Sequence, residues 1–591
     1  MTAETTPHRV FEKGRTLADH PAYFVKRSGT WQPTTWRQYA AEVRAAAKSL
    51  IALGIQPGDR VNILGFNRPE WVIFDVAAMA VGAVPAGIYT TNSPAECQYI
   101  IAHSEAPVVL VENHDQWAKV NEVRSQLPAL RRVVLMSDAG PVDDDLVMSW
   151  DEFVASGAGV ADADLDTRLE ALQPDDLATL IYTSGTTGPP KGVMLSHDNL
   201  GWTAGQVMEP AGITASDRLV SYLPLSHIAE QSFTIHGAAN AGYSVYYAES
   251  IEALADNLKE VEPTVFFAVP RVWERFYAGV TAELGHATGV KAKIAAWAQR
   301  VGRKVADVRN AGGEPGGALA SQYKVASALV FAKVKRALGL GKVRFAVSGA
   351  APVSKEILEF FSGLDILVYE VYGQSEDTGP TSINLPGMTK FGSVGPAYPG
   401  VEVKIADDGE VLVRGRNVFL GYFRDAEATK ETLVDGWLHS GDLGEFDGDG
   451  FLTITGRKKD IIITAGGKNV APKAFEGGLK NHPLVAEAVM IGDRRKYLTC
   501  VITLDDAAAE AYLKAHDLSG PAHESAAIHS ELQQAIDAVN ANFARVEQVK
   551  KFAVLARPLS IEAGELTPTL KVKRNKVAEH FAPEIEALYV E

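Results

Sequence analysis

Residues 180–195 read Leu-Ile-Tyr-Thr-Ser-Gly-Thr-Thr-Gly-Pro-Pro-Lys-Gly-Val-Met-Leu, a loop rich in glycine and hydroxyl groups between two β-prone runs. Hydroxyls and backbone N–H groups at such a turn can surround phosphate oxygens, and Lys191 adds a positive charge. A Walker-type loop is excluded, because Lys191 is followed by Gly192 and a strand-like run instead of Ser or Thr and a helix. We interpret the stretch as a binding loop for a nucleoside triphosphate, with a flexible surface loop as the alternative.

Strand-like runs alternate along the chain with longer helical patterns. These runs are 60–64, 108–111, 179–182, 220–223, 265–269 and 343–347. The alternation predicts α/β layers with largely parallel sheets, in which ligands sit at the carboxyl ends of strands. From 401 to 455, short strands separated by Gly and Asp turns predict a small antiparallel unit that closes the large domain.

The composition is that of a soluble globular protein. With 591 residues the chain is too long for one core, so two or more domains are expected. The two cysteines, Cys97 and Cys500, form neither a metal-binding spacing nor a disulfide framework, so a reducing cytoplasm is expected. A net charge of −16 argues against a general nucleic-acid binder.

No membrane span or signal peptide is expected. Residues 1–16 lack an apolar stretch, and the apolar run 72–89 is interrupted by Asp75 and several Gly and Pro residues. We therefore expect 72–89 to be a buried helix that runs into a strand.

One basic stretch departs from the acidic average. Residues 291–342 contain eleven Lys and Arg against Asp307 and Glu314, and apolar residues recur at helical spacing from Ile294 to Val308. Such a pattern can rest on an anionic membrane surface, which would make the protein peripheral at the inner face of the membrane. The alternative, which we favour, is a surface helix that packs its apolar stripe on the protein; residues 312–317 would be a turn between two helices.

Four further motifs follow the phosphate loop in a fixed order. They are Tyr372-Gly373-Gln374-Ser375-Glu376, Ser440-Gly441-Asp442, Gly456-Arg457-Lys458-Lys459-Asp460 and the segment 564–576. Together with Thr183–Lys191, this set resembles the adenylate-forming (ANL) superfamily of acyl-CoA synthetases, luciferases and peptide-synthetase adenylation domains. The resemblance covers nearly the whole chain. It implies an α/β fold with a large N-terminal domain, 1–458, of layered α/β subdomains and a small antiparallel β unit, hinged to a smaller, mobile α+β C-terminal domain, 459–591.

The resemblance also implies roles in binding ATP. The residues that would surround the phosphates are Thr183, Ser184, Gly185, Thr186, Thr187, Gly188 and Lys191. Glu376 would bind Mg²⁺, for which a carboxylate oxygen is a suitable ligand.

The base and the ribose would be held by other motifs. The residues assigned to the adenine site are Gly349, Ala350, Ala351, Tyr372, Gly373, Gln374 and Ser375. The first three have small side chains that let the backbone approach the base, and Tyr372 offers a flat ring. Asp442 suits the ribose hydroxyls as an acceptor, and Arg457 is a second candidate.

A second step with coenzyme A is implied by the same family. Its C-terminal domain rotates between the two half-reactions about a hinge residue, which Lys459 matches. Lys571 matches the lysine that serves adenylation, with Lys573 two residues away as the alternative. Gly466, Gly467 and Lys468 belong to a small, flexible loop expected along the pantetheine path.

The substrate is indicated by two shorter stretches. Residues 221–229 and 269–274 resemble the long-chain fatty acyl-CoA synthetases, particularly the bubblegum-type branch. His227 could lie near the acyl carboxylate, although a single histidine can equally be structural. We expect a cytoplasmic long-chain fatty acid–CoA ligase that uses ATP, Mg²⁺ and coenzyme A. The rivals are a fatty acyl-AMP ligase that transfers to a carrier protein and a non-catalytic lipid- and nucleotide-binding regulator.

Overall fold

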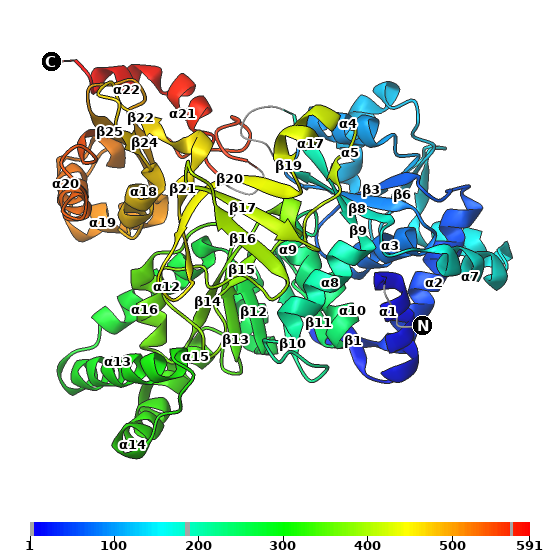
Figure 1. Ribbon diagram of the computed structural model, residues 1–591, viewed down its shortest axis with the longest axis horizontal. Coiled ribbons are helices and arrows are strands. Elements are labelled where there is room, and N and C mark those ends of the chain that lie inside the picture. Colours follow the sequence, from blue (N-terminus) through cyan, green and yellow to red (C-terminus); the bar gives the residue numbers. More distant parts are fainter. Residues whose placement is uncertain (1–4, 184–188, 568–570, 591) are drawn as a thin grey trace.

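The computed structural model describes residues 5–183, 189–567 and 571–590. Its largest sheet has the order β18-β9-β8-β4-β3-β5-β6-β7 (Figure 1). The strands are β3 (Arg60–Leu64), β4 (Val84–Ile88), β5 (Val108–Val111), β6 (Arg132–Leu135), β7 (Val147–Ser149), β8 (Leu177–Thr183), β9 (Lys191–Ser196) and β18 (Gly421–Tyr422). From β8 through β4, β3, β5 and β6 to β7, each strand runs parallel to the next, whereas β9 is antiparallel to both β8 and β18.

A buried, largely apolar helix precedes strand β4 of this sheet. Helix α3 (Pro69–Ala80) is buried at every residue after Pro69 and continues through a short turn into β4. This confirms the prediction of a buried helix that runs into a strand. Among the described residues, no helix is long and apolar enough to cross a bilayer.

Two four-stranded sheets complete the α/β layers. One has the order β10-β11-β1-β2 and the other β12-β13-β14-β15. Their strands are β1 (Pro21–Arg27), β2 (Thr30–Thr35), β10 (Arg218–Ser221), β11 (Ser244–Tyr247), β12 (Val265–Ala268), β13 (Phe345–Ser348), β14 (Val368–Tyr372) and β15 (Ser382–Ile383). Because β12, β13 and β14 are parallel, the loops after β13 and β14 meet at one edge of the sheet.

The predicted antiparallel unit is confirmed. It has the order β16-β17-β20-β19, with β21 paired to β20. Its strands are β16 (Val401–Ile405), β17 (Glu410–Gly415), β19 (Leu433–Val434), β20 (Trp437–Phe446) and β21 (Leu452–Arg457).

A smaller C-terminal domain follows the short helix η6 (Lys458–Asp460) and lies at one corner of the molecule (Figure 1, orange to red). Its elements are β22 (Ile462–Ile463), β23 (Asn469–Val470), α18 (Pro472–Lys480), β24 (Val485–Ile491), β25 (Leu498–Leu504), α19 (Asp506–Ala515), α20 (Ala526–Asn540), β26 (Val549–Val554), α21 (Arg574–His580) and α22 (Ala582–Ala587). Phe475, Cys500 and Leu532 belong to a core of its own. The fold class is therefore as predicted, a large α/β domain followed by a smaller α+β domain.

The basic stretch forms protruding helices (Figure 1). Helix α13 (Gly289–Asn310) is joined by the predicted turn to α14 (Gly317–Ala326), η4 (Ser327–Phe331) and α15 (Ala332–Ala337). Val301 and Val305 of the apolar stripe are buried against Phe331 and Leu364. The stripe thus packs on the protein, as the favoured interpretation predicts.

Candidate functional site

The two ends of the phosphate loop lie on neighbouring antiparallel strands. Thr183 at the end of β8 lies opposite Lys191 at the start of β9. The residues between them that were assigned to the phosphates, Ser184, Gly185, Thr186, Thr187 and Gly188, lie outside the described residues. The ammonium of Lys191 is 4.7 Å from the centre of the Tyr422 ring, a cation–π contact that directs the lysine toward β18.

Tyr422 also contacts the candidate magnesium ligand. Its hydroxyl donates to Oε1 of Glu376 at 2.8 Å, and Glu376 lies on the short helix η5 (Ser375–Asp377) that follows β14. Burial and the Glu376 carboxylate raise the pKa of Tyr422, so the phenol keeps its proton and remains a donor. Sequence reasoning missed Tyr422, because its position follows from the pairing of β18 with β9 and no local motif marks it.

The turn that carries Glu376 accepts only glycine at its start. A Cβ at Gly373 would lie 1.5 Å from the carbonyl oxygen of Gly379. The turn is closed by Asp377, whose buried carboxyl accepts from Gln374 N at 2.7 Å and from the Thr381 hydroxyl at 2.7 Å. This close packing fixes where Glu376 leaves the sheet edge.

Small residues follow the neighbouring strand at the same edge. A Cβ at Gly349 would lie 2.5 Å from Val371 Cγ1, and Ala350 adopts a positive φ of 66°. Gly349, Ala350 and Ala351 therefore lie beside Tyr372 and Gly373, as their assignment to one base site requires.

The two residues assigned to the ribose contact each other, and one of them also contacts Tyr372. Asp442 on β20 lies opposite Arg457 on β21, and Arg457 Nε is 3.2 Å from Asp442 Oδ1. The Tyr372 hydroxyl donates to the other oxygen, Oδ2, at 2.9 Å. The Asp442 carboxylate is thus held by the charge of Arg457 on the neighbouring strand and by the hydroxyl of Tyr372, which is 70 residues earlier in the chain.

The C-terminal domain supplies Lys571 to this group. Lys571 directly precedes Val572, which pairs with Leu566, and its backbone N–H donates to the Thr567 hydroxyl at 3.0 Å. Its side chain retains contact with solvent but is surrounded in part by charged groups of both domains. The surrounding protein lowers the pKa of Lys571 to about 8, chiefly through desolvation and then through the positive charges of Arg457 and Lys473.

Carboxylates of the N-terminal domain act on the same lysine. Asp442 and Glu376 oppose the fall in the pKa of Lys571 by favouring its charged form. Lys573 instead occupies the N-cap of α21, where its backbone N–H donates to Glu565 O at 2.7 Å. The arrangement therefore gathers Lys571, Glu376, Asp442 and Arg457 across the domain boundary.

His227, in the N-terminal domain, also lies within range of the charge of Lys571. It is the N-cap of α9 (Ile228–Gln231), and its Nδ1 accepts from Ala229 N at 3.2 Å. Burial and the charge of Lys571 lower the pKa of His227 to about 4, so the ring is neutral near pH 7. Since Nδ1 accepts a hydrogen bond, the proton of the neutral ring is assigned to Nε2, which is then a donor.

The candidate pantetheine loop and hinge lie elsewhere. Gly466, Gly467 and Lys468 are exposed between β22 and β23, and Lys468 pairs with Glu547 of its own domain at 3.5 Å. This conformation therefore brings Lys571, and not this loop, to Glu376. Lys459 is exposed, whereas the preceding Lys458 bonds to Asp408 of the antiparallel unit at 2.7 Å.

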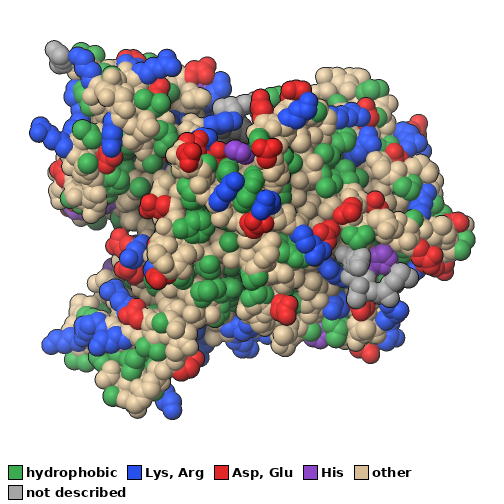
Figure 2. Space-filling model, viewed as in Figure 1, with side chains coloured by type: hydrophobic (Ala, Val, Ile, Leu, Met, Phe, Trp, Pro, Cys, Tyr) green, Lys and Arg blue, Asp and Glu red, His purple; other side chains and the backbone are tan. Residues whose placement is uncertain are grey.

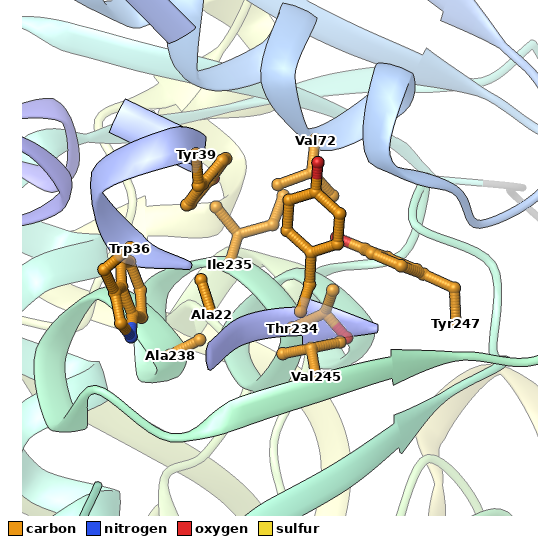
Figure 3. A pocket seen from close by; sticks show the side chains of 10 residues that line it. Ala22, Trp36, Tyr39, Val72, Thr234, Ile235, Ala238, Val245 and Tyr247 are labelled. Carbon is orange, nitrogen blue, oxygen red and sulfur yellow. The ribbon is translucent and has the colours of Figure 1, made fainter. Parts of the chain in front are cut away.

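A small cavity lies apart from these groups, between β1, α2 (Trp36–Ala52), η3 (Ser232–Gly237) and β11 (Figure 3). Its lining residues are Ala22, Tyr23, Trp36, Tyr39, Val72, Thr234, Ile235, Ala238, Val245 and Tyr247. Its volume of about 10 Å³ accommodates about one water molecule. The cavity is too small to hold an acyl tail, so it does not show where such a tail would lie.

Comparisons with known proteins agree with this arrangement. A family model described as AMP-binding enzyme matches residues 10–423, and one described as AMP-binding enzyme C-terminal domain matches residues 459–591. The chain is 38% identical to the long-chain-fatty-acid–CoA ligase ACSBG2 of Xenopus laevis, over 99% of this chain and 84% of that protein. It is 40% identical to the long-chain-fatty-acid–CoA ligase FadD15 of Mycobacterium tuberculosis, over 98% of this chain and 96% of the relative.

Solved structures show the same fold at low identity. The A domain of carboxylic acid reductase from Segniliparus rugosus, in complex with AMP and a co-purified carboxylic acid, superposes with a TM-score of 0.77 at 21% identity, covering 100% of this chain and 94% of that one. The anthranilate CoA ligase AuaEII in complex with anthranoyl-AMP gives a TM-score of 0.73 at 20% identity, covering 98% and 97% of the two chains. On the two family matches and the near-complete coverage of its relatives, the chain belongs to the family of AMP-binding enzymes.

Proposed function

We propose that this protein is a long-chain fatty acid–CoA ligase that converts a fatty acid and ATP into an acyl-adenylate and pyrophosphate, and then forms acyl-CoA and AMP. The observation that carries the proposal is the gathering of Lys571 with Glu376, Asp442 and Arg457 across the domain boundary. The names of the relatives support the choice of acid and of thiol.

In the first step, a carboxylate oxygen of the fatty acid attacks the α-phosphorus of ATP, and pyrophosphate leaves. Two anions must approach, so the protein contributes mainly positive charge and orientation. Lys571 would neutralise the carboxylate and the α-phosphate, and Lys191 would neutralise the β- and γ-phosphates. His227 Nε2–H would donate, as part of a neutral ring, to a carboxylate oxygen.

The residues present fit a magnesium ion. Oε1 of Glu376 accepts from Tyr422, which leaves Oε2 as a hard oxygen ligand, and phosphate oxygens and water complete the usual shell. Among the described residues, no group of three or more His, Cys, Asp or Glu could hold a metal ion. When bound, the ion would offset phosphate charge.

Asp442 and Arg457 are proposed to hold the ribose. The Asp442 carboxylate accepts a hydrogen bond from the Tyr372 hydroxyl and forms an ion pair with Arg457, and it retains acceptor capacity for a ribose hydroxyl. The Tyr372 ring and the backbone at Gly349 would bind adenine.

In the second step, the sulfur of coenzyme A bonds to the acyl carbon as the bond to AMP breaks, and the thiol proton is released. Lys571 is proposed to act in the first step only. The exposed loop Gly466–Lys468 is proposed to line the pantetheine path after the C-terminal domain has turned at Lys459.

The test is release of pyrophosphate and AMP from ATP and Mg²⁺, with mass detection of products, across fatty acids of increasing length, with and without coenzyme A. Pyrophosphate with long-chain acids, and acyl-CoA only when coenzyme A is present, is the expected result. Adenylate without thioester would favour the ligase that transfers to a carrier protein. No pyrophosphate with any acid would favour the lipid- and nucleotide-binding regulator.

We also propose a cytoplasmic location with peripheral contact between the basic helices and an anionic membrane. Figure 2 shows Lys and Arg side chains gathered over the end formed by α13 and α14. Val325 and Leu329, one helical turn apart, are 50% and 46% exposed. Sedimentation with phosphatidylserine vesicles should be lost in Leu329→Glu and retained in Val546→Glu, a change at an exposed apolar residue of the C-terminal domain. No sedimentation of the unaltered protein would contradict this proposal.

A further inference from the structure

Lys473 is a charged residue of the domain boundary that no motif identified. It is the second residue of α18 and is half-buried. Within the described parts of the chain, no carboxylate forms an ion pair with it. Its positive charge instead acts on Lys571, whose pKa it lowers together with Arg457.

The position of Lys473 is fixed by packing on the antiparallel unit. Ala471, just before α18, lies against Gly456, where an added Cβ would be 3.2 Å from the Ala471 methyl. Gly456 directly precedes Arg457, which pairs with Asp442. The first turn of α18 thus begins beside the residues assigned to the ribose.

A buried ion pair ties Lys473 and Lys571 to one framework. Glu476 lies three residues after Lys473, and Arg574 lies three residues after Lys571. Arg574 Nη1 donates to Glu476 Oε1 at 2.6 Å, and this guanidinium is largely buried. The two lysines therefore belong to segments that are held together and move as one part of the C-terminal domain.

This arrangement of charge is costly in the unliganded protein. Lys473, Lys571 and Arg457 repel one another, and a cation in the first turn of a helix also opposes the helix dipole. The first turn of α18 contains no acidic residue, and Ala471 offers no side-chain cap. A polyanion between the lysines would offset these costs.

We propose that Lys473 is a further phosphate-binding lysine of the adenylation step, in addition to Lys191 and Lys571, which contacts the triphosphate of ATP and leaves with Lys571 when the C-terminal domain turns. The inference rests on the proposed function for its substrate and names a residue that the family motifs do not. Phosphates also occur in coenzyme A, so the experiment must separate the two sources.

The first measurement is equilibrium binding of ATP with Mg²⁺, which needs neither acid nor turnover. Lys473→Met should weaken ATP binding about tenfold to a hundredfold, as expected for a lost charge-assisted hydrogen bond, and Lys473→Arg should stay near the unaltered protein. Lys514→Met is the matched control, because it removes an exposed charge of the same domain and should leave ATP binding unchanged. Unchanged ATP affinity in Lys473→Met would overturn the proposal.

Separate assays of the two half-reactions then show whether Lys473 binds the phosphates of ATP or those of coenzyme A. Lys473→Met should slow acid-dependent exchange of pyrophosphate into ATP and spare transfer from preformed acyl-adenylate to coenzyme A. A defect confined to the transfer step would assign Lys473 to coenzyme A and overturn the proposal. Absence of exchange in the unaltered protein with every acid would count against the proposed function, whereas the ATP-binding result would still decide the role of Lys473.

A pH profile distinguishes an effect of the charge of Lys473 from a purely structural role of this residue. Removing the positive charge at 473 should raise the pKa of Lys571, so the alkaline decline of the exchange rate should move to higher pH in Lys473→Met and not in Lys473→Arg. The other groups that act on Lys571, namely Arg457, Asp442 and Glu376, are unchanged in both variants. A purely structural role would lower the rate without moving the profile.

Discussion

Replacing Gly373 by alanine should disable adenylation while the fold persists. The added methyl would lie 1.5 Å from Gly379 O and 2.9 Å from Asp377 Oδ1. An ordinary contact needs about 3.4 Å, so the two sides of the turn must separate by roughly 2 Å. That movement breaks the 2.9 Å bond from Gly379 N to Gln374 O and the 2.7 Å bond from Gln374 N to Asp377. Overpacking of about 1–3 kcal/mol and two bonds of about 1 kcal/mol each give a loss of roughly 3–5 kcal/mol.

The same displacement moves Glu376, which lies inside the turn. A catalytic group displaced by 1 Å can cost about a hundredfold in rate, so we expect at least that loss in pyrophosphate exchange. Thermal unfolding and exchange should be measured beside Gly448→Ala, a control at an exposed turn with nothing within 4 Å of the new methyl. Exchange within twofold of the unaltered protein, with an unchanged melting temperature, would refute this reasoning.

Three further predictions concern single side chains. Tyr422→Phe removes the 2.8 Å bond to Glu376 and keeps the ring, so the Mg²⁺ concentration for half-maximal exchange should rise about tenfold; an unchanged titration would contradict the role of this bond. Asp75, in α3, is buried with neither carboxyl oxygen hydrogen-bonded, and burial raises its pKa well above the usual range. The unaltered protein therefore loses stability as pH rises from about 4 toward the raised pKa, and Asp75→Asn should melt higher at pH 7 but not below pH 4; equal melting at both pH values would count against it. Arg271 Nη2 lies 3.8 Å from Asp505 Oδ2 across the domain boundary, and such exposed pairs contribute about 0–1 kcal/mol, so Asp505→Asn should change the ratio of the two half-reaction rates by about fivefold at most. A larger change would show that the pair governs domain position.

The sequence predicted much of the fold because the buried strands are short, β-branched and bounded by turns. The runs 60–64 and 108–111 coincide with β3 and β5. The run 343–347 was displaced, since β13 begins at Phe345, where pairing with β12 starts. Strand ends depend on the neighbouring strand, which local sequence does not contain.

The candidate site was predicted only where residues lie in motifs. Glu376, Asp442 and Lys571 do so, and the structure brings them together. Tyr422 and Lys473 could not be found, because the first depends on pairing between strands more than 200 residues apart and the second on how the C-terminal domain docks. The residues around an acyl tail were not predicted either, since apolar side chains give no local sign of facing a tunnel.

The attachment of Lys458 to Asp408 and Glu410 has a consequence for how the two domains meet. The chain passes from one domain to the other once, and up to Lys458 it is held on the N-terminal domain. The C-terminal domain, and Lys571 with it, is therefore tethered close to the nucleotide site. Short tethers maintain effective concentrations on the order of millimolar. Two separately produced pieces, cut after residue 458, would have to find each other by diffusion, and at micromolar concentrations they would leave the site without its lysine for most of the time.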